Sequence, residues 1–192
     1  MRLIIIDGLD GVGKDTHAEH VSKHYEDKGE RVVVRSHPTS DNFFGRRAKK
    51  ALLGEGKLNQ IKASLYYMFD VLRSVRKYYG RKDIDTLIMV RYLMGTAYLP
   101  SRLARFGYNF FANFVPTSEI MIFLDASPEI VVERFKLRDE KEMFETLESL
   151  VKIRKKALML ADGWSIVDTS GTIKNTKNQI DKILAIVDKS DQ

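Results

Sequence analysis

The stretch that decides the fold is residues 1–16, MRLIIIDGLDGVGKDT. Residues 3–6, LIII, form a run of branched apolar side chains, which is typical of a strand buried on both faces. Residues 8–14, GLDGVGK, follow at once with the G-x-x-x-x-G-K spacing of a phosphate-binding loop. A helical pattern begins directly after this loop. The order of strand, loop, lysine and helix therefore predicts a site for the phosphates of a nucleotide.

The composition of this loop suits that chemistry. Gly8, Gly11 and Gly13 allow backbone N–H groups to face an anion without clashes from Cβ atoms. The helix that starts after the loop points the positive end of its dipole at the same anion. Lys14 adds a mobile positive charge for the outer phosphates. The predicted nucleotide-binding residues are Gly8, Gly11, Val12, Gly13, Lys14, Asp15 and Thr16.

The composition of the whole chain limits its class. Its 192 residues are enough for one domain, residues 1–192, with a substantial core. With 44% hydrophobic and 30% charged residues, and without an apolar run near the ~20 residues that span a bilayer, we expect a soluble protein with no membrane partner. The first apolar run stops at Asp7, too early for a signal peptide, so a cytoplasmic location is expected.

Charge and cysteine content narrow the class further. The absence of cysteine excludes disulfides, zinc–thiolate sites and thiol nucleophiles. The net charge of +6 points to an anionic ligand, either a nucleotide or a nucleic acid. The basic residues between 73 and 82 are shared between a helix face and a turn, which is typical of a solvated surface. We therefore expect a nucleotide, and nucleic-acid binding is the less favoured interpretation.

Strand and helix patterns alternate along the chain. Strands are predicted at residues 3–6, 31–35, 84–90, 120–125 and 164–168. Helices are predicted at residues 15–28, 43–53, 57–79, 102–115, 144–161 and 176–188, with a short helix ending near residue 98 and another that begins at Ser127. This alternation predicts an α/β protein with a five-stranded parallel sheet between layers of helices, the three-layer fold of P-loop NTPases.

Three groups of residues on the predicted helices have an expected location, either in the core or at the surface. An apolar stripe of the long helix is expected to be buried: Ile61, Leu65, Met68, Leu72 and Val75. Four phenylalanines are expected in the core, with a dimer face as the alternative for part of them: Phe106, Phe110, Phe111 and Phe114. Three histidines are expected on a solvated helix face rather than around a metal ion: His17, His20 and His24.

The later motifs, in their order and spacing, resemble those of the thymidylate kinase family nearly end to end. The family opens with (E/D)-G-x-(D/E)-G-x-G-K-(S/T)-T, and residues 7–16 read DGLDGVGKDT. The family has F-x-x-x-R in its long helix, where the ring stacks on thymine and the guanidinium bonds a base carbonyl; Phe69 and Arg73 match it. The family has D-R-Y after its third strand, where the sequence has Val90, Arg91 and Tyr92.

This resemblance implies a role for each matching residue. The resemblance implies that Arg91 binds the acceptor phosphate, that Asp10 contacts the 3′-hydroxyl of the acceptor sugar, and that Tyr98 packs on the deoxyribose. The implied substrate-binding set is Asp10, Phe69, Arg73, Arg91, Tyr92 and Tyr98. A lid over about residues 134–145 is implied by the family's R-x-x-x-R motif at Arg134 and Arg138 and by the Phe-Glu pair at residues 144–145. Residues 164–169 resemble the last strand, which leads to a loop beside adenine.

The reaction implied is phosphoryl transfer from ATP to dTMP, giving dTDP and ADP, with Mg²⁺ as cofactor. Such a transfer depends on in-line positioning and charge neutralisation, so no general base is assigned. The cations expected to offset the charge of the two anionic substrates are Lys14, Arg91, Arg134 and Arg138. Members of the family are commonly homodimers, which makes a homodimer the expected assembly.

The chain departs from the family pattern at three places. Asp15 stands where the family has the hydroxyl that ligates Mg²⁺, and Val90 stands where it has an aspartate. Residues 37–40, HPTS, replace a loop that usually carries Arg or Glu near a proline. We therefore expect Asp15 to take over metal positioning. Two alternatives stay open: a kinase for another nucleotide or nucleoside, and a catalytically weakened protein that still binds nucleotide.

Overall fold

The computed structural model describes residues 1–54, 56–99, 101–136 and 146–190, without the side chains of residues 57, 98, 101–103 and 190. Its sheet has five parallel strands in the order β2-β3-β1-β4-β5. The strands are β1 (Arg2–Gly8), β2 (Val32–Ser36), β3 (Thr86–Val90), β4 (Ile120–Asp125) and β5 (Ser165–Asp168). The predicted α/β class with a five-stranded parallel sheet is confirmed.

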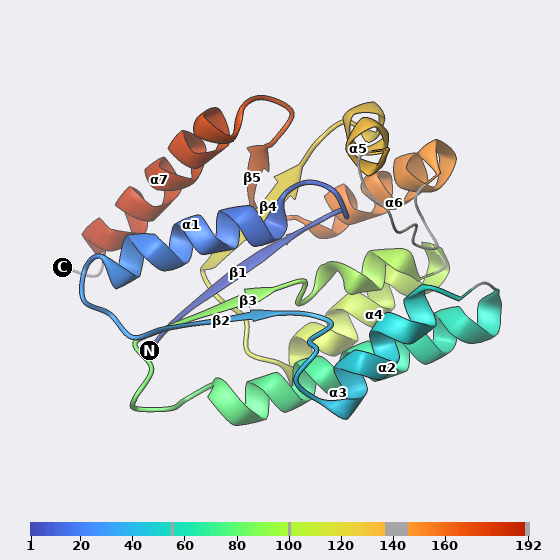
Figure 1. Cartoon of the computed structure of the whole chain (residues 1–192), viewed down its shortest axis with the longest axis horizontal. Coiled ribbons are helices and arrows are strands. Elements are labelled where there is room, and N and C mark those ends of the chain that lie inside the picture. The colour runs from blue at the N-terminus through green and yellow to red at the C-terminus, as the bar shows by residue number, and fades with distance from the viewer. Residues whose placement is uncertain (55, 100, 137–145, 191–192) are drawn as a thin grey trace.

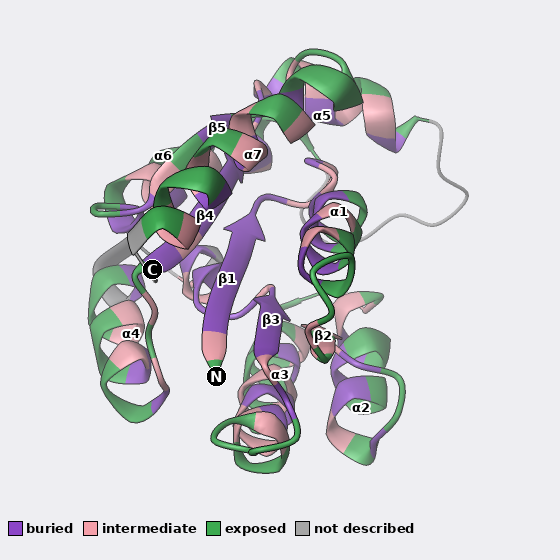
Figure 2. Cartoon of the chain, turned by 90° about the vertical axis from the view of Figure 1, so that its left-hand side faces the viewer, coloured by how far each residue is buried: buried purple, intermediate pink, exposed green. Residues whose placement is uncertain are grey.

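Helices cover both faces of this sheet (Figure 1). They are α1 (Lys14–Glu26), α2 (Phe43–Leu52), α3 (Lys57–Tyr78), the 3₁₀ helix η1 (Met94–Tyr98), α4 (Ser101–Phe114), α5 (Pro128–Phe135), α6 (Leu147–Leu160) and α7 (Ile173–Ser190). Seen along the strands, α1 and α7 lie on one face and α3 and α4 on the other (Figure 2). Among the described helices, none is long and apolar enough to cross a membrane.

The opening strand β1 occupies the centre of the sheet, which explains its apolar sequence. β3 pairs with one edge of β1 and β4 with the other, and Ile4, Ile5 and Ile6 are fully buried because helices cover both faces of the sheet. Ile6 lies opposite both Val90 and Ile122 in the register of the two pairings. The carboxyl ends of β1 and β3 therefore lie side by side, which is the edge where open α/β sheets bind ligands.

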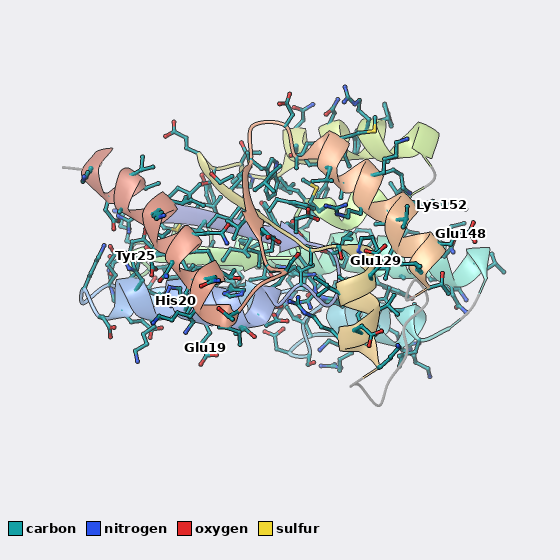
Figure 3. All side chains as sticks on the ribbon, turned by 90° about the horizontal axis from the view of Figure 1, so that it is seen from above. Glu19, His20, Tyr25, Glu129, Glu148 and Lys152 are labelled. Carbon is teal, nitrogen blue, oxygen red and sulfur yellow. The ribbon has the colours of Figure 1, made fainter. Side chains whose placement is uncertain are left out.

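The histidine face of α1 is not solvated, so that expectation was wrong. His20 Nε2 lies 2.7 Å from Asp181 Oδ1, and His24 Nε2 lies 3.1 Å from Asp188 Oδ2. Both aspartates belong to α7, which packs against α1 on the side where His20 lies (Figure 3). His17 is buried. In the described part of the chain, no group of three or more His, Cys, Asp or Glu side chains is arranged to hold a metal ion.

The phenylalanines of α4 divide between core and surface. Phe111 is buried, as expected, but Phe106, Phe110 and Phe114 are 69%, 51% and 66% exposed. Their four-residue spacing places these three rings on one face of the helix, where neighbouring ring centroids lie 6.2 and 4.6 Å apart. The core prediction was therefore wrong for this aromatic stripe.

Candidate active site

A cleft of about 1260 Å³ opens at the carboxyl edge of the sheet. One end is charged and is lined by residues from the phosphate-binding loop, the loop after β2, and the start of the segment after β3. The other end is apolar, because α3 and α4 contribute Ile61, Leu65, Met68, Phe110 and Phe111. Ile61 and Leu65 are 57% and 48% exposed, so the predicted buried stripe of α3 faces the cleft at these positions.

The phosphate-binding loop has the backbone that its glycines predict. Gly8 has φ 151°, and a Cβ atom there would lie 2.3 Å from the carbonyl oxygen of Leu124. Gly13 has φ 87° at the start of α1. Lys14 is buried and its Nζ donates to the carbonyl oxygens of Gly8, at 3.0 Å, and Leu9. Burial lowers the pKa of Lys14. The ammonium group therefore lies inside the loop, where phosphate oxygens can replace the carbonyl acceptors.

The backbone at Arg91 is unusual and is held in place by a buried carboxylate. Arg91 has φ 53°, a left-handed conformation that a residue with a side chain seldom adopts without surrounding support. Asp7 is 1% exposed, and its Oδ2 accepts the next three backbone N–H groups, from Tyr92, Leu93 and Met94, at 2.9, 2.8 and 3.1 Å. Burial raises the pKa of Asp7, and these three donors oppose the shift. Asp7 thus fixes the turn that aims Arg91 along the cleft.

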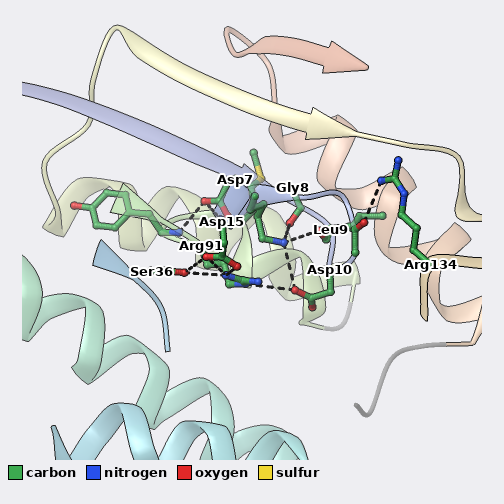
Figure 4. A network of polar contacts seen from close by, with 12 residues as sticks. Asp7, Gly8, Leu9, Asp10, Asp15, Ser36, Arg91 and Arg134 are labelled. Carbon is green, nitrogen blue, oxygen red and sulfur yellow. Dashed lines mark hydrogen bonds and ion pairs between the residues drawn. The ribbon is translucent and has the colours of Figure 1, made fainter. Parts of the chain in front are cut away.

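The side chain of Arg91 lies among two carboxylates and a hydroxyl (Figure 4). Its Nη1 donates to Asp15 Oδ2 at 2.9 Å, to Asp15 Oδ1 at 3.1 Å and to Ser36 Oγ at 2.9 Å. Its Nε lies 3.5 Å from Asp10 Oδ1, which in turn lies 3.3 Å from Lys14 Nζ. Burial raises the pKa of Asp15, but the charge of Arg91 and a hydrogen bond from Ser36 lower it below its ordinary value.

Phe69 and Arg73 do not line the cleft. The Phe69 ring packs against Phe44 of α2 with centroids 5.4 Å apart, and Arg73 Nη1 lies 3.9 Å from Asp41. The two residues are four apart, so they share the face of α3 that packs on α2. The base site at this pair stays a prediction, because Phe69 is 44% exposed and Arg73 lies beside Asp41, which lines the cleft. The neighbouring face of α3 reaches the cleft instead, through Ile61, Ser64, Leu65, Tyr67 and Met68.

The tyrosines predicted to bind substrate have different outcomes. Tyr92 is buried, does not line the cleft, and donates its hydroxyl to the carbonyl of Pro116 at 3.0 Å. Its side chain is a core residue, whereas Arg91, Leu93 and Met94 on either side of it line the cleft. The backbone of Tyr98 ends η1, but its side chain lies outside the described residues.

The predicted lid is described only in part, because Arg138 and residues 144–145 lie outside the described residues. Arg134 ends near the loop, on the side away from Arg91 (Figure 4). It donates to the carbonyl oxygens of Gly11 at 3.1 Å and Thr169 at 2.5 Å. In this structure Arg134 joins α5 to the phosphate-binding loop and to the segment after β5.

Among the residues that line the cleft, Asp7, Ser36 and Tyr67 had no role assigned from the sequence, and His37 belongs to the loop of residues 37–40 that departs from the family pattern. Asp7, Ser36 and His37 stand at or just beyond the carboxyl ends of β1 and β2, which is the position that indicates ligand-edge residues. His37 is 1% exposed, its Nδ1 donates to the carbonyl of Val90 at 3.1 Å, and burial lowers its pKa to about 4. Tyr67 donates its hydroxyl to the carbonyl of Arg91 and so supports the same turn as Asp7.

Known proteins are similar to this chain over most of its length. The sequence model of the family described as thymidylate kinase matches residues 6–180. The chain belongs to the thymidylate kinase family. As a member of that family it is an ATP-dependent nucleoside monophosphate kinase. A probable thymidylate kinase of Archaeoglobus fulgidus is 30% identical to it, over 95% of this chain and 94% of that one.

Other members extend the comparison. A thymidylate kinase of Akkermansia muciniphila is 26% identical, over 96% of this chain and 92% of the relative. The solved thymidylate kinase of Candida albicans superimposes with a TM-score of 0.74 at 18% identity, over 97% of this chain and 92% of that one, which shows that the fold is shared. The predicted P-loop NTPase architecture is confirmed.

Two of the departures from the family pattern, Val90 and Asp15, lie near each other through Arg91. Val90 is fully buried in the sheet, where it pairs with Ile6 and brings no charge to the cleft. Asp15 supplies a carboxylate from the first turn of α1, and it reaches Arg91, the residue that follows Val90. This chain therefore has a carboxylate beside its cleft arginine, but on a different element from the one that the family pattern predicts.

Proposed function

We propose that the protein transfers the γ-phosphoryl group of ATP to the 5′-phosphate of dTMP, forming dTDP and ADP. The observation that carries this proposal is the placement of two cations in one cleft, Lys14 from the phosphate-binding loop and Arg91 from the end of β3. One cation suits a phosphate donor and the other a phosphorylated acceptor. An arginine dedicated to the acceptor phosphate favours a monophosphate over a nucleoside.

The donor phosphates bind the loop. The backbone amides around Val12 and Gly13, the first turn of α1 with Thr16, and Lys14 together provide donors and positive charge for the β- and γ-phosphates. Arg134, bonded to the carbonyl of Gly11, adds positive charge behind the loop.

Mg²⁺ is the cofactor that this chemistry requires, and the donor set of the cleft suits it. The Asp15 side chain is 60% exposed at the cleft, next in sequence to Lys14, and carboxylate oxygens are ligands that Mg²⁺ prefers. Bound Mg²⁺ supplies neutralisation of the donor phosphates' charge. Asp15 is the residue we assign to hold it.

The acceptor lies between Arg91 and the apolar end of the cleft. Arg91 binds its phosphate and Asp10, beside both cations, faces its sugar. The base lies against α3, where Phe69 and Arg73 are the pair that the family resemblance implies, and where Ser64, Tyr67 and Met68 line the adjoining wall of the cleft. The reaction then needs only alignment of the two anions and neutralisation of their charge, because phosphoryl transfer involves little covalent chemistry from the enzyme.

The assembly we propose is a cytoplasmic homodimer. The exposed stripe of Phe106, Phe110 and Phe114 provides an apolar, self-complementary helix face of the kind that symmetric dimers bury. Light scattering after size exclusion tests this: the wild-type chain is expected at twice its 22.1 kDa mass and a Phe110→Arg variant at the monomer mass. A wild-type monomer at all concentrations would refute the dimer.

Release of ADP tests the proposed reaction. The assay supplies ATP and Mg²⁺ with dTMP, dUMP, dCMP, dGMP, AMP or thymidine in turn, and a Lys14→Met variant measures the background. Selective turnover of dTMP is the expected result. Faster turnover of another acceptor would show that this acceptor, and not dTMP, is the preferred substrate. The departure from the family pattern at residues 37–40 would then be the first candidate for the changed specificity. Binding of ATP without turnover of any acceptor would identify a catalytically weakened nucleotide-binding protein.

A further inference from the structure

The residue proposed to bind the metal is bonded to the residue proposed to bind the acceptor. Asp15 places both carboxylate oxygens within 3.1 Å of Arg91 Nη1, and Ser36 Oγ, which donates to Asp15 Oδ1 at 2.6 Å, accepts from the same nitrogen. Asp15 therefore occupies Nη1 of Arg91, and an acceptor phosphate that binds this nitrogen competes with the carboxylate.

The charges of the cleft balance while this contact exists. The cations Lys14 and Arg91 face the carboxylates Asp10 and Asp15, and each cation lies within 3.5 Å of a carboxylate oxygen. A phosphate with two negative charges gains little from a neutral cluster, and it is repelled by a carboxylate that shares its arginine. Binding of the acceptor therefore requires Asp15 to leave Arg91.

Asp15 is free to make that change, whereas Asp10 is not. The Asp15 side chain is 60% exposed on the first turn of α1, while that of Asp10 is 29% exposed and lies between both cations. Rotation of the Asp15 side chain toward the donor phosphates needs no change in the backbone. It leaves Arg91 in place, because its turn is held by Asp7.

We infer that Asp15 is a positioning residue that couples the two substrate sites of this enzyme: it holds Arg91 while the donor site is empty and releases it when it turns to a metal-bound nucleotide. The inference rests on the proposed function, because it takes the donor and acceptor sites from there. Coupling between sites is reciprocal, so the metal-bound nucleotide and dTMP should each strengthen binding of the other. A serine or asparagine at this position, without the charge, should not produce this coupling.

Calorimetry of dTMP binding tests the inference without turnover. Wild type and Asp15→Asn are titrated with dTMP in EDTA, and again with Mg²⁺ and a non-hydrolysable ATP analogue. In EDTA, Asp15→Asn is expected to bind dTMP about tenfold more tightly than wild type, which lies within the usual range of coupling between sites. Addition of Mg²⁺ and the analogue should tighten wild type by a similar factor and change the variant by less than about threefold.

Two matched variants separate coupling from general effects of charge. Glu19→Gln removes one negative charge from an exposed position of the same helix and should bind dTMP as wild type does. Ser36→Ala removes the hydrogen bonds that the Ser36 hydroxyl makes with Arg91 and with Asp15, does not change the charge, and should retain the coupling. Tightening by Glu19→Gln equal to that of Asp15→Asn would overturn the inference.

Weaker or equal binding of dTMP by Asp15→Asn in EDTA would also overturn the inference, because Asp15 would then not compete with the acceptor. The proposed function has a separate readout in ADP release. Turnover of dTMP together with equal affinities in EDTA would refute the coupling and leave the reaction standing. Failure of wild type to bind dTMP under both conditions would refute both.

Discussion

Replacement of Asp7 by alanine is the perturbation for which the structure provides the clearest magnitude. The Asp7 carboxylate is 1% exposed and is the acceptor for three consecutive buried backbone N–H groups, those of residues 92–94. A buried donor that loses its partner costs about 1 to 3 kcal/mol. Water that enters the space left by the side chain will satisfy part of this demand. The loss in free energy of unfolding should therefore be about 3 to 5 kcal/mol, a large share of the roughly 5 to 15 kcal/mol of a typical domain.

The same change should affect acceptor binding. Asp7 holds the turn that keeps Arg91 at φ 53°, so without it the arginine loses its fixed direction and the KM for dTMP should rise about tenfold or more. Urea unfolding followed by circular dichroism measures the first effect, and ADP release at varied dTMP measures the second. Asp7→Asn keeps an oxygen acceptor and is the matched control, with an expected loss near 1 kcal/mol. Stability within 1 kcal/mol of wild type and an unchanged KM for Asp7→Ala would refute the reasoning.

Four further predictions follow from the same geometry. Arg91→Ala should lower kcat/KM for dTMP by about 10²–10³, with Arg91→Lys restoring only part; an unchanged ratio would remove Arg91 from the acceptor site. Burial lowers the pKa of both His17 and His37 to about 4, so the unfolded chain binds more protons than the folded chain below pH 6.5. The free energy of unfolding should therefore fall by about 2 kcal/mol per histidine between pH 7 and 5, as measured by urea unfolding. His37→Gln should reduce this pH-dependent loss. Tyr67→Phe removes a hydrogen bond to the Arg91 carbonyl and should lower the free energy of unfolding by about 1 kcal/mol in the same experiment. An unchanged free energy of unfolding would show that this bond does not stabilise the turn. EDTA should abolish ADP release and excess Mg²⁺ should restore it; turnover that persists in EDTA would refute the cofactor.

The part of the site that is local in sequence could be predicted. A phosphate-binding loop is built from the backbone of consecutive residues, so the spacing of Gly8, Gly13 and Lys14 was sufficient to identify it. The strand before it could be recognised because a central parallel strand is buried on both sides. Arg91 was predicted at the cleft for a similar reason, since the residue after a parallel strand lies at the ligand edge.

The orientation of helices was not predictable in the same way. A periodic pattern shows which residues share a helix face, but it does not show which neighbour that face meets. Phe69 and Arg73 do share a face, and in the structure this face also contacts Phe44 of α2 and Asp41, neighbours that the periodicity did not indicate. The histidines of α1 share a face as predicted, and α7, which follows more than 140 residues later, covers it.

The sequence by itself therefore determined the phosphate loop, the central strand and the α/β class, because each depends on residues that are near one another along the chain. Only the tertiary structure decided the partners of Arg91. The sheet order β2-β3-β1-β4-β5 places the ends of β1, β2 and β3 together, and Asp15, Ser36 and Arg91 meet there although up to 76 residues separate them. The sequence shows only that Asp15 replaces a hydroxyl residue, whereas the structure shows that its carboxylate contacts Arg91. The energy of this contact depends on the distance between the charges in space and not on their separation along the chain.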